Sequence, residues 1–195
     1  AANLARGDFG VSAIYGEPVL TVIGKRFVVS LGLMSLAWVL SGLAGFALGA
    51  LAGALEGSWL DKGIRFYAYM LAGTPTFWLG LLLLIVFSVQ LRLTPICCAF
   101  PPGVQPQDVT CWQWLHHLLL PAATLSIVGI SAVILHTRQK MIHVMHSDFA
   151  LFARAQGEGT FGIVRHHAMR NVALPAITLQ FASLGELFGG SILAE

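Results

Sequence analysis

Ionisable side chains are scarce in this sequence. Of its 195 residues, 10% are charged and 56% are hydrophobic, and the mean hydropathy is +0.77. A soluble domain carries about 25% charged residues, so this chain has too little charge to cover a surface that faces water. The formal net charge of +2 and the lack of a basic run give no indication of nucleic-acid binding. The composition therefore indicates an integral membrane protein.

Motifs of several other protein classes are also missing. The sequence has no Gly-x-Ser-x-Gly phrase of a serine hydrolase, no Walker-type phosphate loop and no charged ring or filter sequence of a channel. A membrane-embedded enzyme and a membrane channel are therefore alternatives without a motif of their own. The first 16 residues lack the apolar core of a signal peptide, and the chain stops directly after an apolar run. We expect it to be a fragment of a longer protein.

Four long stretches are almost free of ionisable side chains. They cover residues 27–55, 66–91, 118–137 and 172–194, and only Glu186 interrupts the last. A helix of about 20 apolar residues crosses the hydrocarbon core, so the sequence predicts an all-α, polytopic transmembrane helical bundle. Gly73-Thr74-Pro75 should divide the second stretch into a helix at about 64–71 and a spanning part. The expected spans are about 27–55, 76–91, 118–137 and 174–194, within a membrane domain of 27–195.

Three glycines are spaced four residues apart in the first stretch, at Gly45, Gly49 and Gly53. A small-xxx-small series leaves one helix face bare and permits close helix packing in lipid. The alternative is that glycine is simply common in membrane helices.

Basic residues are unevenly distributed between the apolar stretches. If residues 138–173 are cytoplasmic, the connection 56–65 is on the same side. These two connections hold seven basic residues: Lys62, Arg65, Arg138, Lys140, Arg154, Arg165 and Arg170. The opposite side holds four: Arg6, Lys25, Arg26 and Arg92. Because cytoplasmic loops carry the excess of Lys and Arg, the sequence predicts a cytoplasmic loop at 138–173 and a periplasmic segment at 1–26.

The predicted cytoplasmic loop contains two helical pieces. Residues 148–156 favour a helix that stops at Gly157, and a second piece follows at about 161–171. Ala153 and Gly157 are i, i+4 neighbours and form a patch of small residues. That geometry suits a short helix lying in a partner's groove.

This loop resembles the EAA loop of ATP-binding-cassette importer permeases, which places a coupling helix against the ATPase subunit. Leu151-Phe152-Ala153 stand at the Glu-Ala-Ala positions, Gly157 at the glycine, and Val172-Ala173-Leu174-Pro175 at the final Ile-x-Leu-Pro. The sequence departs from the family pattern at Leu151, Phe152 and Val172.

These departures are similar to the dipeptide, oligopeptide and nickel branch of the family. Its members read much like Asp-Phe-x-x-x-Ala-Arg-Ala-x-Gly, as residues 148–157 do, and like Arg-His-x-x-Arg-Asn-x-x-Leu-Pro, to which residues 165–175 are similar. Three further segments resemble the branch in the same order: Gly7-Asp8-Phe9-Gly10, Pro75-Thr76-Phe77-Trp78-Leu79 and Gly185-Glu186-Leu187-Phe188. The resemblance covers nearly the whole chain.

The resemblance implies a permease of the type I importer kind, a multi-pass subunit of the bacterial inner membrane. Such a subunit would translocate a small solute, either a peptide or nickel or another chelated metal. It would bind no cofactor, because ATP is hydrolysed on separate cytoplasmic ATP-binding subunits. Its other implied partners are a second permease subunit, a periplasmic solute-binding protein and membrane lipid.

The resemblance also implies site residues. Those expected to couple the chain to the ATPase are Asp148, Ala153, Arg154, Ala155, Gly157, Arg170, Asn171, Leu174 and Pro175. Asp148 would cap the coupling helix. The small side chains of Ala153 and Ala155 would let the ATPase approach the contact face of this helix closely, and Arg154 would pair with a carboxylate of the ATPase. Pro175 would start the fourth span, where its missing amide costs nothing.

Expected translocation-path residues are Pro75, Phe77 and Glu186. Glu186 is the carboxylate inside an apolar stretch, and such residues face the bundle interior or a wet cavity. The alternative for Glu186 is a structural hydrogen bond to a neighbouring helix.

Cysteines and histidines leave further alternatives. Cys97, Cys98 and Cys111 fall in one expected external loop, where a disulfide to Cys111, unpaired thiols and a metal site are all open. Their spacing matches no standard zinc pattern, so we assign no metal. The histidines at 136, 143 and 146 lie on one side of an expected helix. They form either an interfacial polar face or a series of metal ligands.

Overall fold

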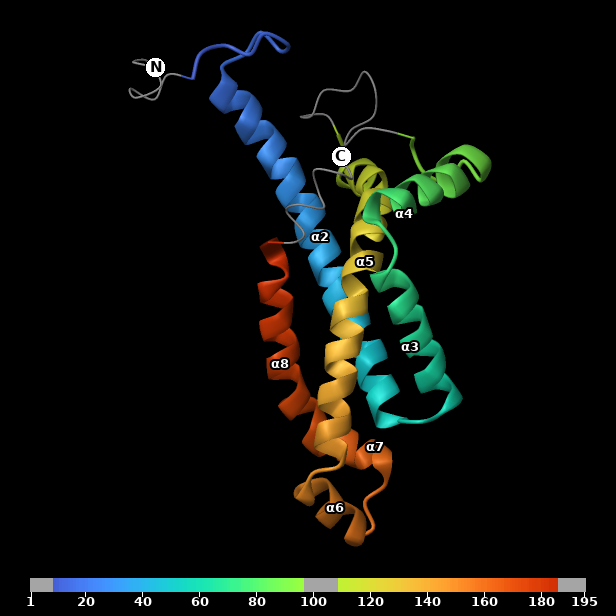
Figure 1. Cartoon of the computed structure of the whole chain (residues 1–195). Coiled ribbons are helices and arrows are strands. Elements are labelled where there is room, and N and C mark those ends of the chain that lie inside the picture. The colour runs from blue at the N-terminus through green and yellow to red at the C-terminus, as the bar shows by residue number, and fades with distance from the viewer. Residues whose placement is uncertain (1–8, 97–108, 186–195) are drawn as a thin grey trace.

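The computed structural model describes residues 9–96 and 109–185 and shows an all-α protein in that part of the chain (Figure 1). The helices are α2 (Val19–Ala54), α3 (Trp59–Ala72), α4 (Thr76–Leu83), α5 (Cys111–Met145), α6 (Asp148–Ala155), α7 (Thr160–Ile163) and α8 (Met169–Ala182). Two π-helical segments, η1 (Leu84–Gln90) and η2 (Val164–Ala168), continue α4 and join α7 to α8. The predicted all-α fold is confirmed.

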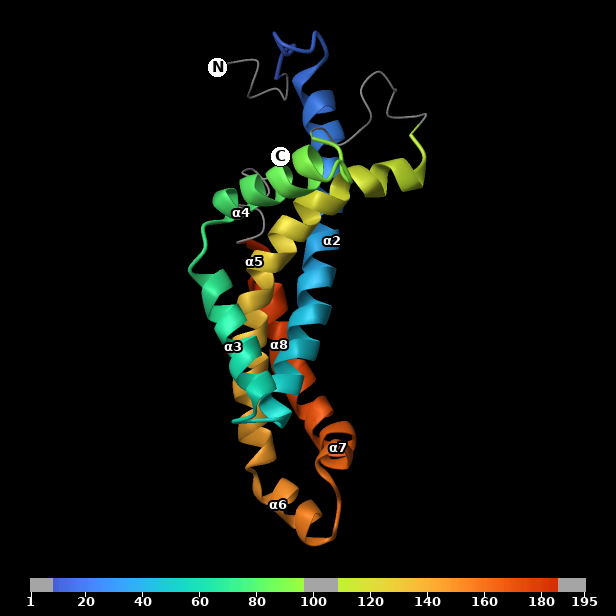
Figure 2. The same cartoon turned by 90° about the vertical axis from the view of Figure 1, so that its right-hand side faces the viewer.

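The two longest helices form the centre of the bundle. α2 and α5 run in the same direction and pack along much of their length, while α3 and α8 run back beside them (Figures 1 and 2). Among the described residues, α2 and the stretch Trp112–Met145 of α5 are each long and apolar enough to cross a membrane. The α3–α4 region qualifies as a third span if its two bent halves count as one.

The glycine series on α2 packs directly against α5. Gly45, Gly49 and Gly53 are buried, and a Cβ atom added to them would lie 2.5–2.7 Å from a Cβ atom of α5. The facing residues are Val133, Thr137 and Met141. The expected close approach of a second helix is therefore confirmed, because only a residue without a side chain fits at these three positions.

The break at Gly73-Thr74-Pro75 is sharper than a kink. The axes of α3 and of the helix Thr76–Gln90 differ in direction by 104°. α3 therefore runs along α5, while α4 and η1 cross the bundle near the end where α2 and α5 begin (Figure 2). The predicted break is confirmed. Residues 76–90 form α4 and η1, which pass as a membrane span only together with α3, so the expected span at 76–91 stays a prediction.

Other helix boundaries also differ from the expected ones. α2 begins at Val19, so the helix includes Lys25 and Arg26, which we expected in a polar segment ending at residue 26. The expected span at 118–137 lies inside the longer α5. α8 ends at Ala182, and residues 186–194 of the expected fourth span, including Glu186, lie outside the described residues.

Candidate functional site

The predicted cytoplasmic loop lies at one end of the bundle, where α6 projects beyond the long helices and α7 lies beside the end of α5 (Figures 1 and 2). The connection between α2 and α3 lies at the same end. There, the His146 Nε2 atom is 2.8 Å from a carboxylate oxygen of Glu56. The two connections predicted to share a side of the membrane do share an end of the molecule. Which side that is remains a prediction.

A buried ion pair ties these two connections together. Arg138 of α5 donates from Nε and from Nη2 to the two carboxylate oxygens of Asp61, at 2.5 and 2.8 Å. Asp61 also accepts from the Gly57 amide at 2.9 Å, and its own amide donates to Ser58, the N-cap of α3. Only 2% of the Asp61 side chain and 12% of the Arg138 side chain are accessible. Sequence analysis counted Arg138 among the basic residues of the loop and did not single out Asp61.

The N-cap of α6 lies one residue before the expected cap, Asp148. Ser147 is the N-cap of α6, and its hydroxyl donates back to the Val144 carbonyl instead of accepting from the helix. The prediction that Asp148 caps the helix is therefore wrong. Asp148 is exposed in the first turn, where a carboxylate interacts favourably with the helix dipole.

Small residues fix α6 to the bundle. Ala150 and Ala153 are buried in a cluster that also holds Met141, Ile163 and Val172. The prediction that Ala153 lies on the contact face is wrong, because its methyl group faces this cluster. Ala155 and Arg154 are exposed, so they remain available to a partner.

Four large apolar side chains are exposed on the loop, among charged and polar ones. Phe149, Leu151, Phe152 and Phe161 are 41, 51, 64 and 78% exposed, and we call these four residues the docking surface. Large exposed apolar patches mark interaction sites, and these four side chains are a candidate for one. Sequence analysis treated Leu151 and Phe152 as departures from a family pattern and did not single out the other two.

Gly157 follows the end of α6, as expected. Its φ of +89° is left-handed, a conformation that a glycine adopts without a Cβ clash. The Glu158 amide donates to Ala153 O at 3.0 Å and the Gly157 amide to Arg154 O at 2.9 Å. This pair of hydrogen bonds is a Schellman motif, which reverses the chain toward α7.

Glu158 joins the turn to η2. Its two carboxylate oxygens lie 3.0 Å from His166 Nδ1 and 3.1 Å from His167 Nε2. Hydrogen bonding from His166, and less strongly from His167, holds the pKa of Glu158 below its ordinary value. Sequence analysis did not identify this contact, because residues eight and nine positions apart have no fixed relation across a turn.

The remaining predicted coupling residues lie on α8. Arg170, Asn171 and Leu174 are exposed, and the Asn171 side chain donates to the His167 carbonyl at 3.0 Å. Pro175 lies inside α8, so the prediction that it starts a span is wrong. The helix continues through the proline, which leaves the Asn171 carbonyl without its intrahelical donor.

The expected translocation-path residues do not meet the coupling residues. Pro75 is the N-cap of α4 and Phe77 is 58% exposed on it. α4 lies far from α6, toward the other end of the bundle (Figure 2).

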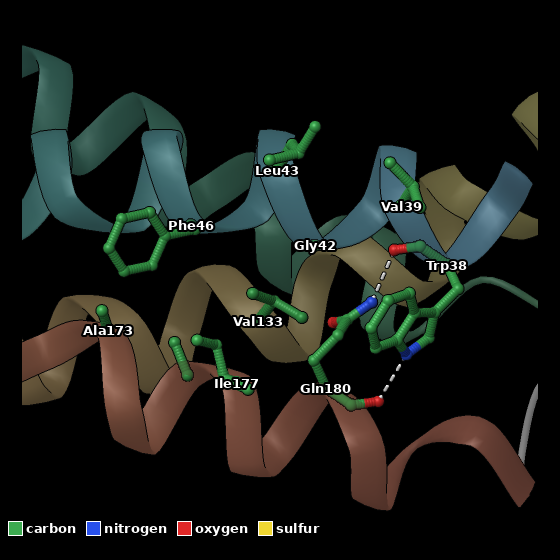
Figure 3. A pocket seen from close by; sticks show the side chains of 10 residues that line it. Trp38, Val39, Gly42, Leu43, Phe46, Val133, Ala173, Ile177 and Gln180 are labelled. Carbon is green, nitrogen blue, oxygen red and sulfur yellow. Dashed lines mark hydrogen bonds between the residues drawn. The ribbon is translucent and has the colours of Figure 1, made fainter. Parts of the chain in front are cut away.

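A cavity of about 300 Å³ lies between α2, α5 and α8, and neither Pro75 nor Phe77 lines it. At one end, Trp38 Nε1 donates to the Gln180 carbonyl at 2.8 Å, and Gln180 Nε2 donates to the Trp38 carbonyl at 2.7 Å (Figure 3). Gln180 is therefore a polar link between α2 and α8 beside an apolar cavity.

Cys97 and Cys98 lie outside the described residues, as does the side chain of Cys111 at the start of α5. Within the described ranges, no three His, Cys, Asp or Glu side chains are placed to hold a metal ion. Of the histidines on α5 and its C-cap, His136 and His143 are exposed and His146 contacts Glu56.

Comparisons with known proteins agree on one family. The model of the family described as "Binding-protein-dependent transport system inner membrane component" matches residues 45–195. The chain is 31% identical over its whole length to a probable peptide ABC transporter permease of Sinorhizobium fredii, covering 61% of that protein.

Two further relatives are an oligopeptide transport system permease of Bacillus subtilis and a glutathione transport system permease of Escherichia coli. Both are 32% identical to this chain over 99–100% of its length, which covers 60 and 59% of those proteins. The chain thus spans about 60% of the length of these curated relatives. With its apolar, membrane-length helices, it belongs to the family of binding-protein-dependent transport system inner membrane components.

Proposed function

We propose that this chain is the membrane-spanning permease subunit of an ATP-driven importer, and that its α6–α7 loop docks on a cytoplasmic ATP-binding subunit. The observation that carries the proposal is the docking surface. Four large apolar side chains are exposed on a loop whose inner face is buried against α5 and α8. Such a loop offers apolar side chains to a partner and is packed against the long helices on its other face.

The loop's attachment supports a mechanical role. Ala150, Ala153 and Ile163 share one buried cluster with Met141 of α5 and Val172 of α8. Close-packed interiors transmit displacement because their side chains cannot compress. A push on α6 would therefore move α5 and α8 as bodies and bias an inward–outward equilibrium. ATP would be bound and hydrolysed on the partner, and this chain would do no bond chemistry.

The remaining partners follow from the family. A second permease subunit would complete the translocation path, and a periplasmic solute-binding protein would deliver the substrate. We propose a small peptide as the substrate, supported by the peptide, oligopeptide and glutathione transport named for the relatives. Nickel or another chelated metal is the second candidate and rests on the branch resemblance alone. Uptake assays with peptides and metal ions would decide between them, and transport of sugars alone would contradict both.

Site-specific cross-linking tests the docking. Arg154→Cys places a thiol beside the docking surface, and Leu93→Cys places one at the other end of the bundle, where Leu93 is 60% exposed. In membranes that contain the ATP-binding subunit of the same transport system, we expect a thiol cross-linker to join it to Arg154→Cys and not to Leu93→Cys. Cross-linking from both positions, or from Leu93→Cys alone, would overturn the proposal.

A further inference from the structure

The turn between α6 and α7 depends on one residue that contacts both arms of the loop. Through its backbone, Glu158 donates to the Ala153 carbonyl at the end of α6. Through its side chain, it accepts from His166 and His167 of η2. The position of α6 relative to η2 is therefore set in part by this carboxylate.

The geometry also specifies where protons are held. An ionised carboxylate only accepts hydrogen bonds, so the facing ring nitrogens, His166 Nδ1 and His167 Nε2, must each carry a proton. The two rings are nearly perpendicular, at 86°, with centroids 6.4 Å apart. Each ring thus serves one oxygen of the same carboxylate.

From this arrangement we propose that Glu158, His166 and His167 form a proton-dependent clamp that fixes the α6–α7 turn on η2 and so sets the orientation of the docking surface. A neutral histidine already donates one hydrogen bond here. A second proton places a positive charge beside the carboxylate, and charge-assisted hydrogen bonds are roughly twice as strong as neutral ones. Histidine is the side chain that ordinarily changes charge between about pH 5 and 8, so the clamp tightens as pH falls through that range.

The charged or titratable partners of Glu158 within the described residues are the two histidines, and hydrogen bonding from them keeps the pKa of its carboxyl low. The Glu158 carboxylate therefore stays ionised over that pH range. From α6, the Phe149 ring lies 6.2 Å from the ring of His167 and brings no charge.

Gly162 of α7 makes room for the clamp. A Cβ atom there would lie 2.7 Å from Glu158 Oε1 and 2.8 Å from its Cγ atom. Gly162→Ala should therefore displace the carboxylate without removing any titratable group. It tests the clamp independently of Glu158→Gln.

Hydrogen exchange of residues 156–168, in the complete transporter in lipid nanodiscs, tests the clamp. After correction for intrinsic chemical rates, we expect exchange several-fold slower at about pH 6 than at about pH 8. Glu158→Gln and Gly162→Ala should both remove this difference. Glu17→Gln, at a carboxylate exposed near the N-terminus of α2, should retain it. No pH difference in the wild type, or the same difference in Glu158→Gln, would overturn the clamp.

The regulatory consequence rests on the proposed docking function, and cross-linking separates the two. Because thiol reactivity itself rises with pH, the yield from Arg154→Cys to the ATP-binding subunit is divided by that of the Arg154→Cys, Glu158→Gln double variant at the same pH, and we expect this ratio to change between the two pH values. A ratio that is independent of pH, alongside pH-dependent exchange, would overturn the control of docking. No cross-link at any pH would instead contradict the docking function and leave the clamp standing on its exchange data.

Discussion

Gly49 of α2 lies so close to Thr137 of α5 that a Cβ atom on the glycine would be 2.6 Å from the Thr137 Cβ atom and 2.7 Å from the Ile134 carbonyl oxygen. One of these neighbours is backbone and cannot rotate away. The contact therefore holds the two central helices at a separation that only glycine permits.

Replacing Gly49 by alanine should separate α2 from α5. Overpacking of a filled interface costs about 1–3 kcal/mol, which exceeds the roughly 0.5–1 kcal/mol that alanine gains over glycine in a helix. Gly24→Ala, on the same helix with no neighbour within 4 Å, is the matched control and should be neutral or stabilising. Thermal unfolding in detergent measures both, and equal melting temperatures for the two variants would contradict the close contact.

Asp61→Asn should destabilise the protein strongly. Removing one partner of a buried, bidentate ion pair leaves the other charge uncompensated, at a cost of about 3–5 kcal/mol. The control is Glu17→Gln, which breaks an exposed pair with Lys25 and should change stability by less than about 1 kcal/mol. Chemical unfolding compares the two, and a small effect at Asp61 would mean that water reaches the Asp61–Arg138 pair.

Gly157→Leu and Arg154→Glu should uncouple transport without preventing membrane insertion. A residue other than glycine at a φ of +89° costs about 1–2 kcal/mol and should distort the turn that follows the coupling helix. Arg154→Glu should repel the carboxylate proposed on the ATPase. Gly63→Leu, exposed on α3 with no neighbour within 4 Å, should transport normally. The coupling role is wrong if both loop variants keep full uptake and full association with the ATPase.

Glu158 should stabilise the loop above the ordinary titration range of glutamate. Its pKa is lowered in the folded protein. The part of its contribution that requires an ionised carboxylate is therefore lost as pH falls from the unfolded value of about 4.3 through the lower folded value. The melting temperature of the wild type should exceed that of Glu158→Gln at about pH 7, and the gap should close well below pH 4. An unchanged gap in strong acid would show that the ionised carboxylate is not the source.

Local patterns in the sequence predicted much of the fold. The apolar stretches gave the helices, and Gly73-Thr74-Pro75 gave the break between α3 and α4. Gly157 gave the end of α6, because a glycine after a helical run is a stop signal that needs no distant partner. The small-residue spacing on α2 gave the face that meets α5.

Local patterns misplaced two residues whose roles depend on their neighbours. Ala153 resembles a residue of a partner-facing surface, but the packing of α5, α7 and α8 buries it. Pro175 resembles a helix start, yet tertiary packing carries α8 through it. A proline inside a membrane helix is tolerated when neighbouring groups compensate for the missing hydrogen bond.

The sequence by itself determined that this chain is an apolar helical protein with one polar loop, because hydrophobicity and helix punctuation act over one or two turns. Only the tertiary structure decided which residues of that loop face outward, how Asp61 reaches Arg138 across 77 positions, and that Glu158 lies between two histidines. These relationships depend on where the chain returns after a turn. The 104° bend belongs with them, since a glycine–proline break permits many angles and the packing of α3 against α5 selects one.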